Sequence, residues 1–261
     1  YIKSVVKLNM IKFKYIESIK GSSKENEDVA SFYNNYCWII DGATDVFETT
    51  NKIGFSVSEF VRKVSSELPS VCDDRKSLED ILRSVISKVS LQFLGTLNFS
   101  EDFFAKLPTF SFIFCREIDD RLEYLVIGDC YLIYNEKIIT DNRISKFSKS
   151  NRLKLERSML EVGTLTEEER LTIFRNTRLK ANRYDGYPIG SMNPNSIKSA
   201  LKGSIYLPKI KKFLIMSDGY FAFYDPLKSL VEISKNIIFH HSKDKLYGKK
   251  DDASVIEGIF I

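Results

Sequence analysis

The chain is poor in the residues that hold small secreted or metal-stabilised folds together. Its 261 residues include only four cysteines and two histidines. The cysteines are scattered along the chain without Cys-x-x-Cys spacing: Cys37, Cys72, Cys115 and Cys130. This pattern argues against a disulfide framework. We interpret these residues as reduced, mostly buried thiols of a cytoplasmic protein.

Long hydrophobic runs and an excess of charge of one sign are also missing. No apolar stretch approaches the roughly 18 residues needed to cross a bilayer, and the N-terminus lacks the apolar core of a signal peptide. We therefore expect no membrane span and no secretory leader. The 39 basic and 35 acidic side chains leave a net charge of +4. Without a Lys/Arg block interleaved with aromatic residues, a nucleic-acid partner is not expected.

The composition that remains is that of an ordinary globular protein, with 43% hydrophobic and 28% charged residues. A chain of this length can bury a substantial core, so we expect a single domain over residues 1–261. The chain starts at Tyr1 and not at Met. We interpret residues 1–10 as a tag or an extension.

Periodicity predicts a mixture of strands and helices. Ile11, Phe13 and Tyr15 alternate with lysines, as in a half-exposed strand, and residues 36–40 form a short apolar run typical of a strand buried on both faces. Further strands are predicted over residues 109–115, 122–129, 131–134, 204–207, 212–216 and 253–261. Apolar stripes at helical spacing cover residues 60–68 and 78–89.

The rest of the chain is less regular. Residues 151–182 are charged and predicted to be helical in pieces, and residues 182–196 are predicted to be a loop. A further helix is expected to begin at Asp225, a good N-cap, with Pro226 at its first position. This order of elements indicates α+β layers and not a regular βαβ series.

Acidic residues stand where apolar runs end. Asp41–Gly42, Asp129 and Asp218–Gly219 each follow such a run, and the pairs Glu27–Asp28 and Asp251–Asp252 precede two others. Each Asp–Gly pair alone is most simply a hairpin turn. Strand ends in one sheet can, however, bring carboxylates together, where they repel one another unless a cation lies among them. Oxygen ligands without His or Cys select Mg²⁺ or Mn²⁺ over Zn²⁺.

Five short motifs in order resemble those of the metal-dependent serine/threonine phosphatases of type 2C, the PPM family, in a divergent, bacterial-like form. They are NED at residues 26–28, IDG at 40–42, IGD at 127–129, SDG at 217–219 and KDDASVI at 250–256. The resemblance extends from about Phe13 to Ile261. It implies a four-layer α-β-β-α sandwich of two antiparallel sheets flanked by helices, and a variable flap or insertion at about residues 150–200. Residues 182–196 would lie in this flap, near the substrate.

The resemblance also implies a metal centre that holds two, or three, Mg²⁺ or Mn²⁺ ions. Asp41 would bridge two metals; Glu27 and the Gly42 carbonyl would hold one, and Asp218 and Asp251 the other. Asp129 resembles the ligand of a third metal in some bacterial members. Asp41 and Asp218 would act catalytically through a metal-activated water.

The implied activity is hydrolysis of phosphoserine and phosphothreonine in proteins, in signalling that opposes a serine/threonine kinase. Two metal ions lower the pKa of a bridging water and orient it for in-line attack on phosphorus, and they neutralise charge on the equatorial oxygens. No covalent intermediate is required.

Two positions depart from the family pattern. Ala43 stands where many relatives have a His that is a proposed general acid, and Ser23 stands where many have an Arg that holds the phosphate. Lys24 is the nearest cation and the candidate phosphate-binding residue, although it lacks the bidentate fork of Arg. Two alternatives therefore stay open: a pseudophosphatase or phosphoprotein-binding regulatory module on the same fold, and a structural α+β domain whose Asp–Gly pairs are turns.

Overall fold

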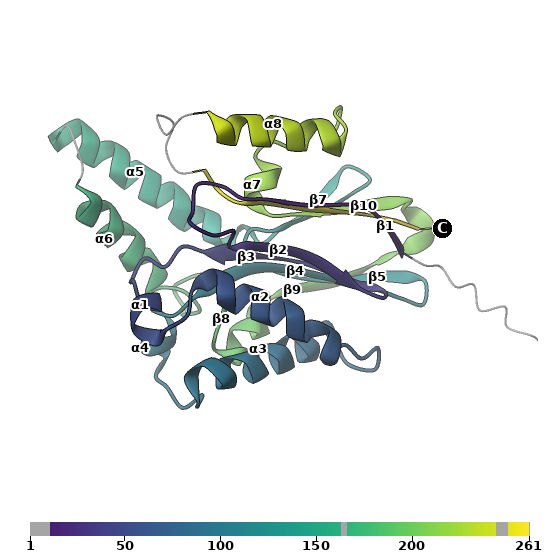
Figure 1. Ribbon diagram of the computed structural model, residues 1–261, viewed down its shortest axis with the longest axis horizontal. Helices are drawn as coiled ribbons and strands as arrows, with labels where there is room; N and C mark the ends of the chain where they lie inside the picture. The colour runs from purple at the N-terminus through teal and green to yellow at the C-terminus, as the bar shows by residue number, and fades with distance from the viewer. Residues whose placement is uncertain (1–10, 163–165, 244–249, 261) are drawn as a thin grey trace, which may run out of the picture.

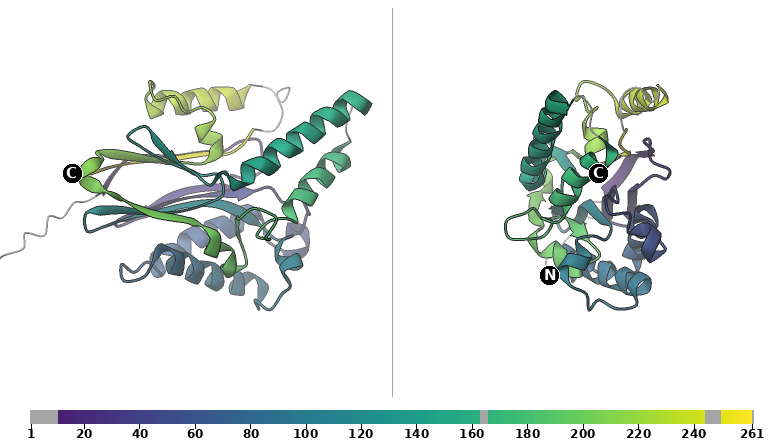
Figure 2. Two further views of the ribbon diagram at one scale, coloured as in Figure 1. Left: turned by 180° about the vertical axis from the view of Figure 1, so that it is seen from behind. Right: turned by 90° about the vertical axis from the view of Figure 1, so that its left-hand side faces the viewer.

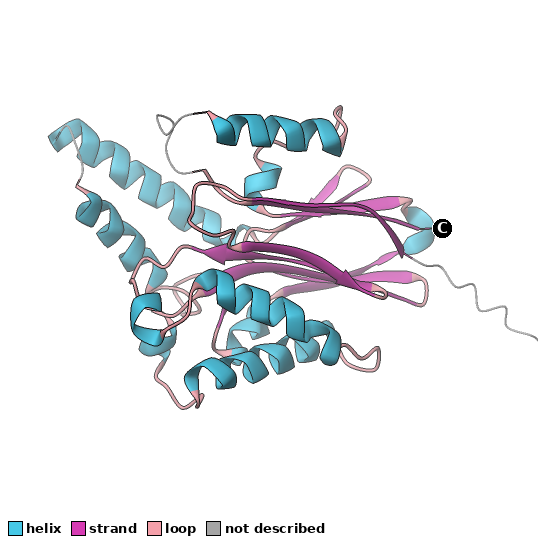
Figure 3. Ribbon diagram, viewed as in Figure 1, coloured by secondary structure: helices cyan, strands magenta, loops and turns pink. Residues whose placement is uncertain are grey.

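The structure is a computed structural model that describes residues 11–162, 166–243 and 250–260. The tag or extension expected at residues 1–10 lies outside these ranges. The described strands form two antiparallel sheets, one above the other (Figure 1). The helices lie on the outer faces of the sheets and at one end of the molecule (Figure 3).

The first sheet has the strand order β1-β11-β10-β6-β7. Its strands are β1 (Ile11–Ile19), β11 (Ala253–Phe260), β10 (Lys212–Met216), β6 (Tyr131–Tyr134) and β7 (Lys137–Ile139). The second sheet has the order β2-β3-β4-β5-β9, and β8 also pairs with β4. Its strands are β2 (Asp28–Tyr33), β3 (Tyr36–Ala43), β4 (Thr109–Ile118), β5 (Arg121–Ile127), β9 (Leu201–Tyr206) and β8 (Gly190–Ser191).

Helices cover the outer face of each sheet (Figure 1). The second sheet is covered by α2 (Val57–Glu67) and α3 (Leu78–Leu94), and the first by α7 (Asp218–Phe221) and α8 (Leu230–Ser242). A helical pair, α5 (Ser145–Val162) and α6 (Glu167–Arg178), projects from one end of the sandwich (Figure 2). The short helices are α1 (Thr50–Ile53), α4 (Glu101–Phe104) and 3₁₀ turns at Leu68–Ser70, Asn142–Ile144, Pro194–Ser199 and Leu207–Lys209. No described helix has the length and apolar character to span a membrane.

Three apolar clusters lie between the layers. Strand β3 shows how they are separated: Trp38 and Ile40 pack toward α2 and α3, whereas Cys37 and Ile39 pack between the two sheets. A third cluster, with Tyr220 and Ile233, lies between the first sheet and its helices. Because β3 is buried on both faces, an unbroken apolar run predicts it correctly. The expected four-layer α-β-β-α sandwich is confirmed.

The predicted helices on the second sheet are also confirmed. Ser56 caps α2 in a capping box with Glu59, and Ser77 caps α3. The helix predicted to begin at Asp225 is wrong, because α8 begins only after Ser229. The Ser229 hydroxyl accepts a hydrogen bond from the Glu232 N–H, and the Glu232 carboxylate accepts one from the Ser229 N–H. This capping box prevails over the Asp-Pro signal, and Asp225 instead accepts from the Leu227 N–H in a turn.

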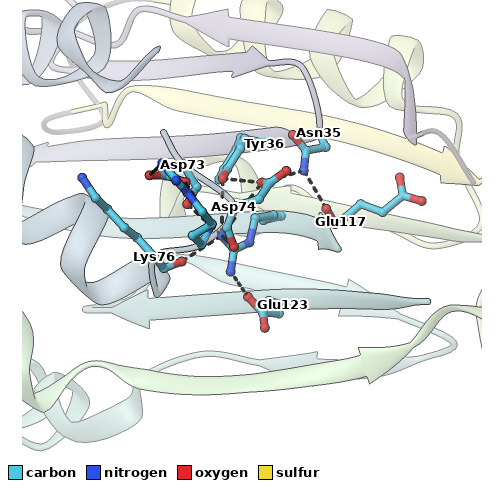
Figure 4. Close-up of polar contacts among 9 residues, drawn as sticks. Asn35, Tyr36, Asp73, Asp74, Lys76, Glu117 and Glu123 are labelled. Carbon is cyan, nitrogen blue, oxygen red and sulfur yellow. Dashed lines mark hydrogen bonds and ion pairs between the residues drawn. The ribbon is translucent and has the colours of Figure 1, made fainter. Parts of the chain in front are cut away.

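A buried arginine joins the α2–α3 loop to the sheet at the end of β4 remote from Thr109. Arg116 is 3% exposed; its guanidinium donates to the Lys76 carbonyl at 2.9 Å and to the Glu123 carboxylate. The Tyr36 hydroxyl donates to Asp74 at 2.6 Å in the same network (Figure 4). The loop is thus fixed by polar contacts to neighbouring strands and by the packing of Val71 and Cys72 against the core.

Candidate metal centre

The register of three neighbouring strands places polar side chains in one row. Asp41 on β3 lies opposite Asp28 on β2 and opposite Ser111 on β4. The Ser111 hydroxyl donates to Asp129, which follows β5, at 2.6 Å. Asp28, Asp41 and Asp129 therefore meet at the same end of the second sheet.

Glycines allow the backbone to pack closely in this row. Gly42 continues β3, and a Cβ there would lie 2.7 Å from the Glu27 carbonyl oxygen, to which the Gly42 N–H donates at 3.0 Å. Gly128 has φ +76°, and a Cβ there would lie 2.2 Å from the Ser111 hydroxyl. The hairpin-turn interpretation of Asp41–Gly42 is wrong, because both residues are inside β3. For Asp218–Gly219 it is wrong as well, since both residues belong to α7.

The first sheet contributes two further acidic segments. Asp218 begins α7 directly after β10, and Asp251 and Asp252 precede β11, the neighbour of β10. Asp252 accepts hydrogen bonds from the Gly21 and Glu27 N–H groups, both at 2.6 Å. This contact ties the polar loop before β2 to the start of β11, so that Glu27 and Asp251 line the same cavity.

A cavity of about 190 Å³ lies where the ends of the two sheets meet. Its acidic lining residues are Glu27, Asp28, Asp41, Asp129, Asp218, Asp251 and Asp252. Carboxylate oxygens of Asp41, Asp129 and Asp218 all lie within 4.8 Å of one another. The structure thus brings together the side chains of three segments that are far apart in the sequence.

These carboxyl groups titrate abnormally because they are buried near one another. Burial raises the pKa of Asp28 to about 7, and the charges of Asp252 and Asp218 contribute. Burial likewise raises the pKa of Asp218 to about 7, with Asp129 and Asp251 adding to the shift. The pKa of Asp41 is raised well above its usual range by burial and by the charges of Asp28, Asp218 and Asp129. A cation among these carboxylates would neutralise the repulsion between their charges.

The residues present fit divalent metal ions. Among the described residues, no ion pair involves Asp41, Asp129 or Asp218. Asp28 is 4% exposed, and its Oδ2 atom has no hydrogen-bond partner in the described part of the chain. The donor set consists of carboxylate oxygens, which hard cations such as Mg²⁺ and Mn²⁺ prefer. The cluster can hold a metal.

The residues chosen from the sequence fall into two groups. Glu27, Gly42 and Asp251 line the cavity around the three clustered aspartates. The side chain of Lys24 is exposed, and Lys24 is not among the residues that line the cavity. Ser23 and Ala43 do line it, so the two departures from the family pattern lie at the site itself.

Sequence reasoning missed Arg178, the last residue of α6. Of the described residues that line the cavity, Arg178 alone is basic. Its guanidinium donates to the Thr109 hydroxyl at the start of β4. No local signal marks Arg178, because its position follows only from how α6 docks on the sandwich. Asp28 and Asp252 also line the cavity; the sequence marks them as members of acidic pairs but does not indicate their roles.

Comparison with known proteins identifies the fold class. The chain has the fold of the PPM-type serine/threonine phosphatases, as its motifs imply. No protein-family model matches the chain, and no curated protein matches it in sequence. The likeness is structural, and it extends over nearly the whole chain.

Three solved structures illustrate this likeness. The catalytic domain of the phosphatase PstP, in complex with two manganese ions, has a TM-score of 0.55 and 14% identity, over 97% of this chain and 99% of that chain. A serine/threonine phosphatase from Staphylococcus aureus has a TM-score of 0.52 and 15% identity, over 95% and 94%. The phosphatase MsPP from Mycobacterium smegmatis, in complex with cacodylate, has a TM-score of 0.51 and 12% identity, over 94% and 97%.

Proposed function

We propose that this protein hydrolyses phosphoserine and phosphothreonine in proteins with the help of bound Mg²⁺ or Mn²⁺. The observation that carries the proposal is the carboxylate cluster of Asp41, Asp129 and Asp218 in a cavity that also contains Arg178. Such a cavity combines anionic ligands for cations with a cationic group for a phosphate. The PPM fold around it supports the same activity.

Each residue has a role in this proposal. Asp41, on β3, would bridge two metals; Glu27 and the Gly42 carbonyl would hold one, and Asp218 and Asp251 the other. Asp129 would hold a third metal and is oriented by the Ser111 hydroxyl. When bound, the metal ions supply Lewis acidity and a nucleophilic water at neutral pH.

Arg178 would orient the phosphoryl group. Its side chain lines the cavity from the flap side, and its contact with Thr109 holds the guanidinium toward β4. A planar guanidinium can donate two parallel hydrogen bonds to a phosphate. Arg178 would therefore replace the arginine that Ser23 does not provide, while Lys24 stays a weaker candidate for the same role.

A second function is favoured by Ala43. This residue lines the cavity at the position where many relatives have the proposed general acid. Without a proton donor for the leaving group, the protein would bind phosphoproteins and metal ions but would not hydrolyse the phosphate ester. The substrate class is the same in both cases: a phosphoprotein modified by a serine/threonine kinase.

One assay separates these functions. Hydrolysis of p-nitrophenyl phosphate and of a phosphothreonine peptide is measured with Mn²⁺ or with EDTA, for the wild type and for Asp218→Ala. Turnover that requires Mn²⁺ and is lost in Asp218→Ala supports the phosphatase. Mn²⁺ binding without turnover supports the binding module, and the absence of both contradicts either function.

A further inference from the structure

A second cavity, of about 560 Å³, adjoins the carboxylate cavity beneath helix α6; we call it the α6 groove. Its apolar lining residues are Val46, Ile144, Leu155, Leu171, Phe174 and Tyr187. Among the described residues, five line both cavities: Thr44, Ile144, Arg178, Tyr187 and Asp251. A chain that places one residue in the carboxylate cavity would therefore have its neighbouring residues in or beside the α6 groove.

The apolar side chains of α6 are incompletely covered. Helix α6 has no fully buried residue among its 12. Leu171 and Phe174, one turn apart, both line the groove, and the Phe174 side chain is 37% exposed. Apolar side chains that converge on a cavity beside a proposed active site indicate a binding surface.

Polar contacts tie helix α6 to the other segments that line the groove. The Arg175 guanidinium donates to the Val46 carbonyl at 2.7 Å, which ties α6 to the segment after β3. The Thr177 hydroxyl donates at 2.8 Å to Asn151, which is 6% exposed and belongs to α5. Because these contacts tie α6 to the segment after β3 and to α5, the groove exists before a ligand binds. Binding would therefore cost the protein little conformational entropy.

We infer that the α6 groove binds an apolar side chain of the substrate, close in sequence to the phosphorylated residue. This inference rests on the proposed function, because the phosphoryl group anchors the peptide between Arg178 and the carboxylate cluster. The continuity of the two cavities favours a substrate segment as the occupant. Burying a Leu or Phe side chain there should strengthen peptide binding about 10- to 100-fold.

The test measures binding without requiring turnover. Peptides carry a non-hydrolysable phosphonate analogue of phosphothreonine in an alanine background, and a single Leu is moved through four positions on each side. Their Kd values are measured by fluorescence anisotropy with Mn²⁺, for the wild type, Leu171→Ala and Phe174→Ala. Phe239→Ala is the matched control, because Phe239 is 57% exposed on α8 and does not line the groove.

The inference predicts that Leu in one or two positions tightens binding at least about tenfold. The ratio of the Kd of the alanine-background peptide to that of the Leu peptide should fall toward one in Leu171→Ala and Phe174→Ala. It should stay unchanged in Phe239→Ala. Equal Kd values for all Leu positions, or an unchanged preference in both groove variants, would overturn it. A dimer that dissociates in Phe174→Ala, as seen by light scattering, would also overturn it and assign the groove to a second copy.

The same proteins separate the inference from the proposed function. Hydrolysis of p-nitrophenyl phosphate, which has no neighbouring residues, reports on the carboxylate cavity alone. A Leu preference without any hydrolysis would support the groove assignment and contradict the proposed phosphatase activity. Hydrolysis without a Leu preference would do the opposite.

Discussion

The ionised carboxylate of Asp41 destabilises the folded protein when no metal is bound. Burial and the three neighbouring aspartates raise its pKa, so that the folded protein without metal disfavours its ionised form. Natural proteins retain such local conflict mainly at functional sites. The loss of stability that the buried charge causes can be measured in the metal-free protein, separately from metal binding.

Asp41→Asn should therefore change stability and activity in opposite directions. Without metal, removing one buried carboxyl should raise the melting temperature at pH 8, because like-charge repulsion decreases. With Mn²⁺, turnover should fall by about two orders of magnitude or more, since a bridging ligand is lost. Differential scanning fluorimetry and the phosphopeptide assay measure the two effects. Asp185→Asn, which changes an exposed aspartate in the loop after α6, is the control and should change neither.

Arg178 should affect the substrate and not the metal. Arg178→Ala is expected to lower kcat/KM for a phosphopeptide about 10- to 1000-fold, as for other charge-stabilising donors. Arg178→Lys should recover only part of this, because Lys lacks the bidentate fork. The Kd for Mn²⁺, measured by calorimetry, should stay the same. If Lys24→Ala lowers kcat/KM more than Arg178→Ala does, the roles of the two residues are reversed.

Helices and strands with a single strong signal are predictable from the sequence. Strand β3 is an apolar run buried on both faces, and α2 and α3 have apolar stripes against one sheet. Helix α8 was misplaced because two competing N-terminal signals, Asp225 and Ser229, stand four residues apart. Helix α6, without a buried residue, could be predicted as helical but not docked, since its position depends on single polar contacts.

The Arg116 network should matter for stability but not for catalysis. Arg116→Met removes the buried guanidinium that binds Lys76 and Glu123, and we expect the free energy of unfolding to fall by about 3 kcal/mol. Urea denaturation measures this. Arg121→Met is the control, because the Arg121 side chain is 55% exposed. Loss of Mn²⁺ binding in folded Arg116→Met would contradict the separation of the network from the metal centre.

Across the whole molecule, the site depends on the meeting of two sheets. The motif order indicated which carboxylates converge, and Asp41, Asp129 and Asp218 do converge. Strand register then explains what the motifs left open, for example why Asp28 lies opposite Asp41. The place of Arg178 in the cavity could not be predicted, because no sequence pattern near Arg178 indicates that α5 and α6 dock beside β4.

The pH dependence of stability should reverse when metal is added. In the metal-free protein, the pKa values of Asp28 and Asp218 are about 7, above the value of about 4 for an unfolded Asp. The folded state therefore holds more protons than the unfolded state between about pH 4 and 7, and stability falls as the pH rises through this window. The melting temperature in EDTA should be lower at pH 7.5 than at pH 5.5.

Mn²⁺ should raise the melting temperature strongly at pH 7.5 and weakly at pH 5.5, because the metal must displace protons from the carboxyl groups. A melting temperature in EDTA that rises between these two pH values would show that the carboxyl groups are not buried together.

Carboxylates from both sheets should bind the same divalent cations. The most direct test is a crystal of the protein soaked in Mn²⁺, with anomalous diffraction measured near the manganese absorption edge. We expect an anomalous peak within about 2.0–2.6 Å of carboxylate oxygens of both Asp41 and Asp218. A fully soaked crystal with no peak between these two residues would contradict it.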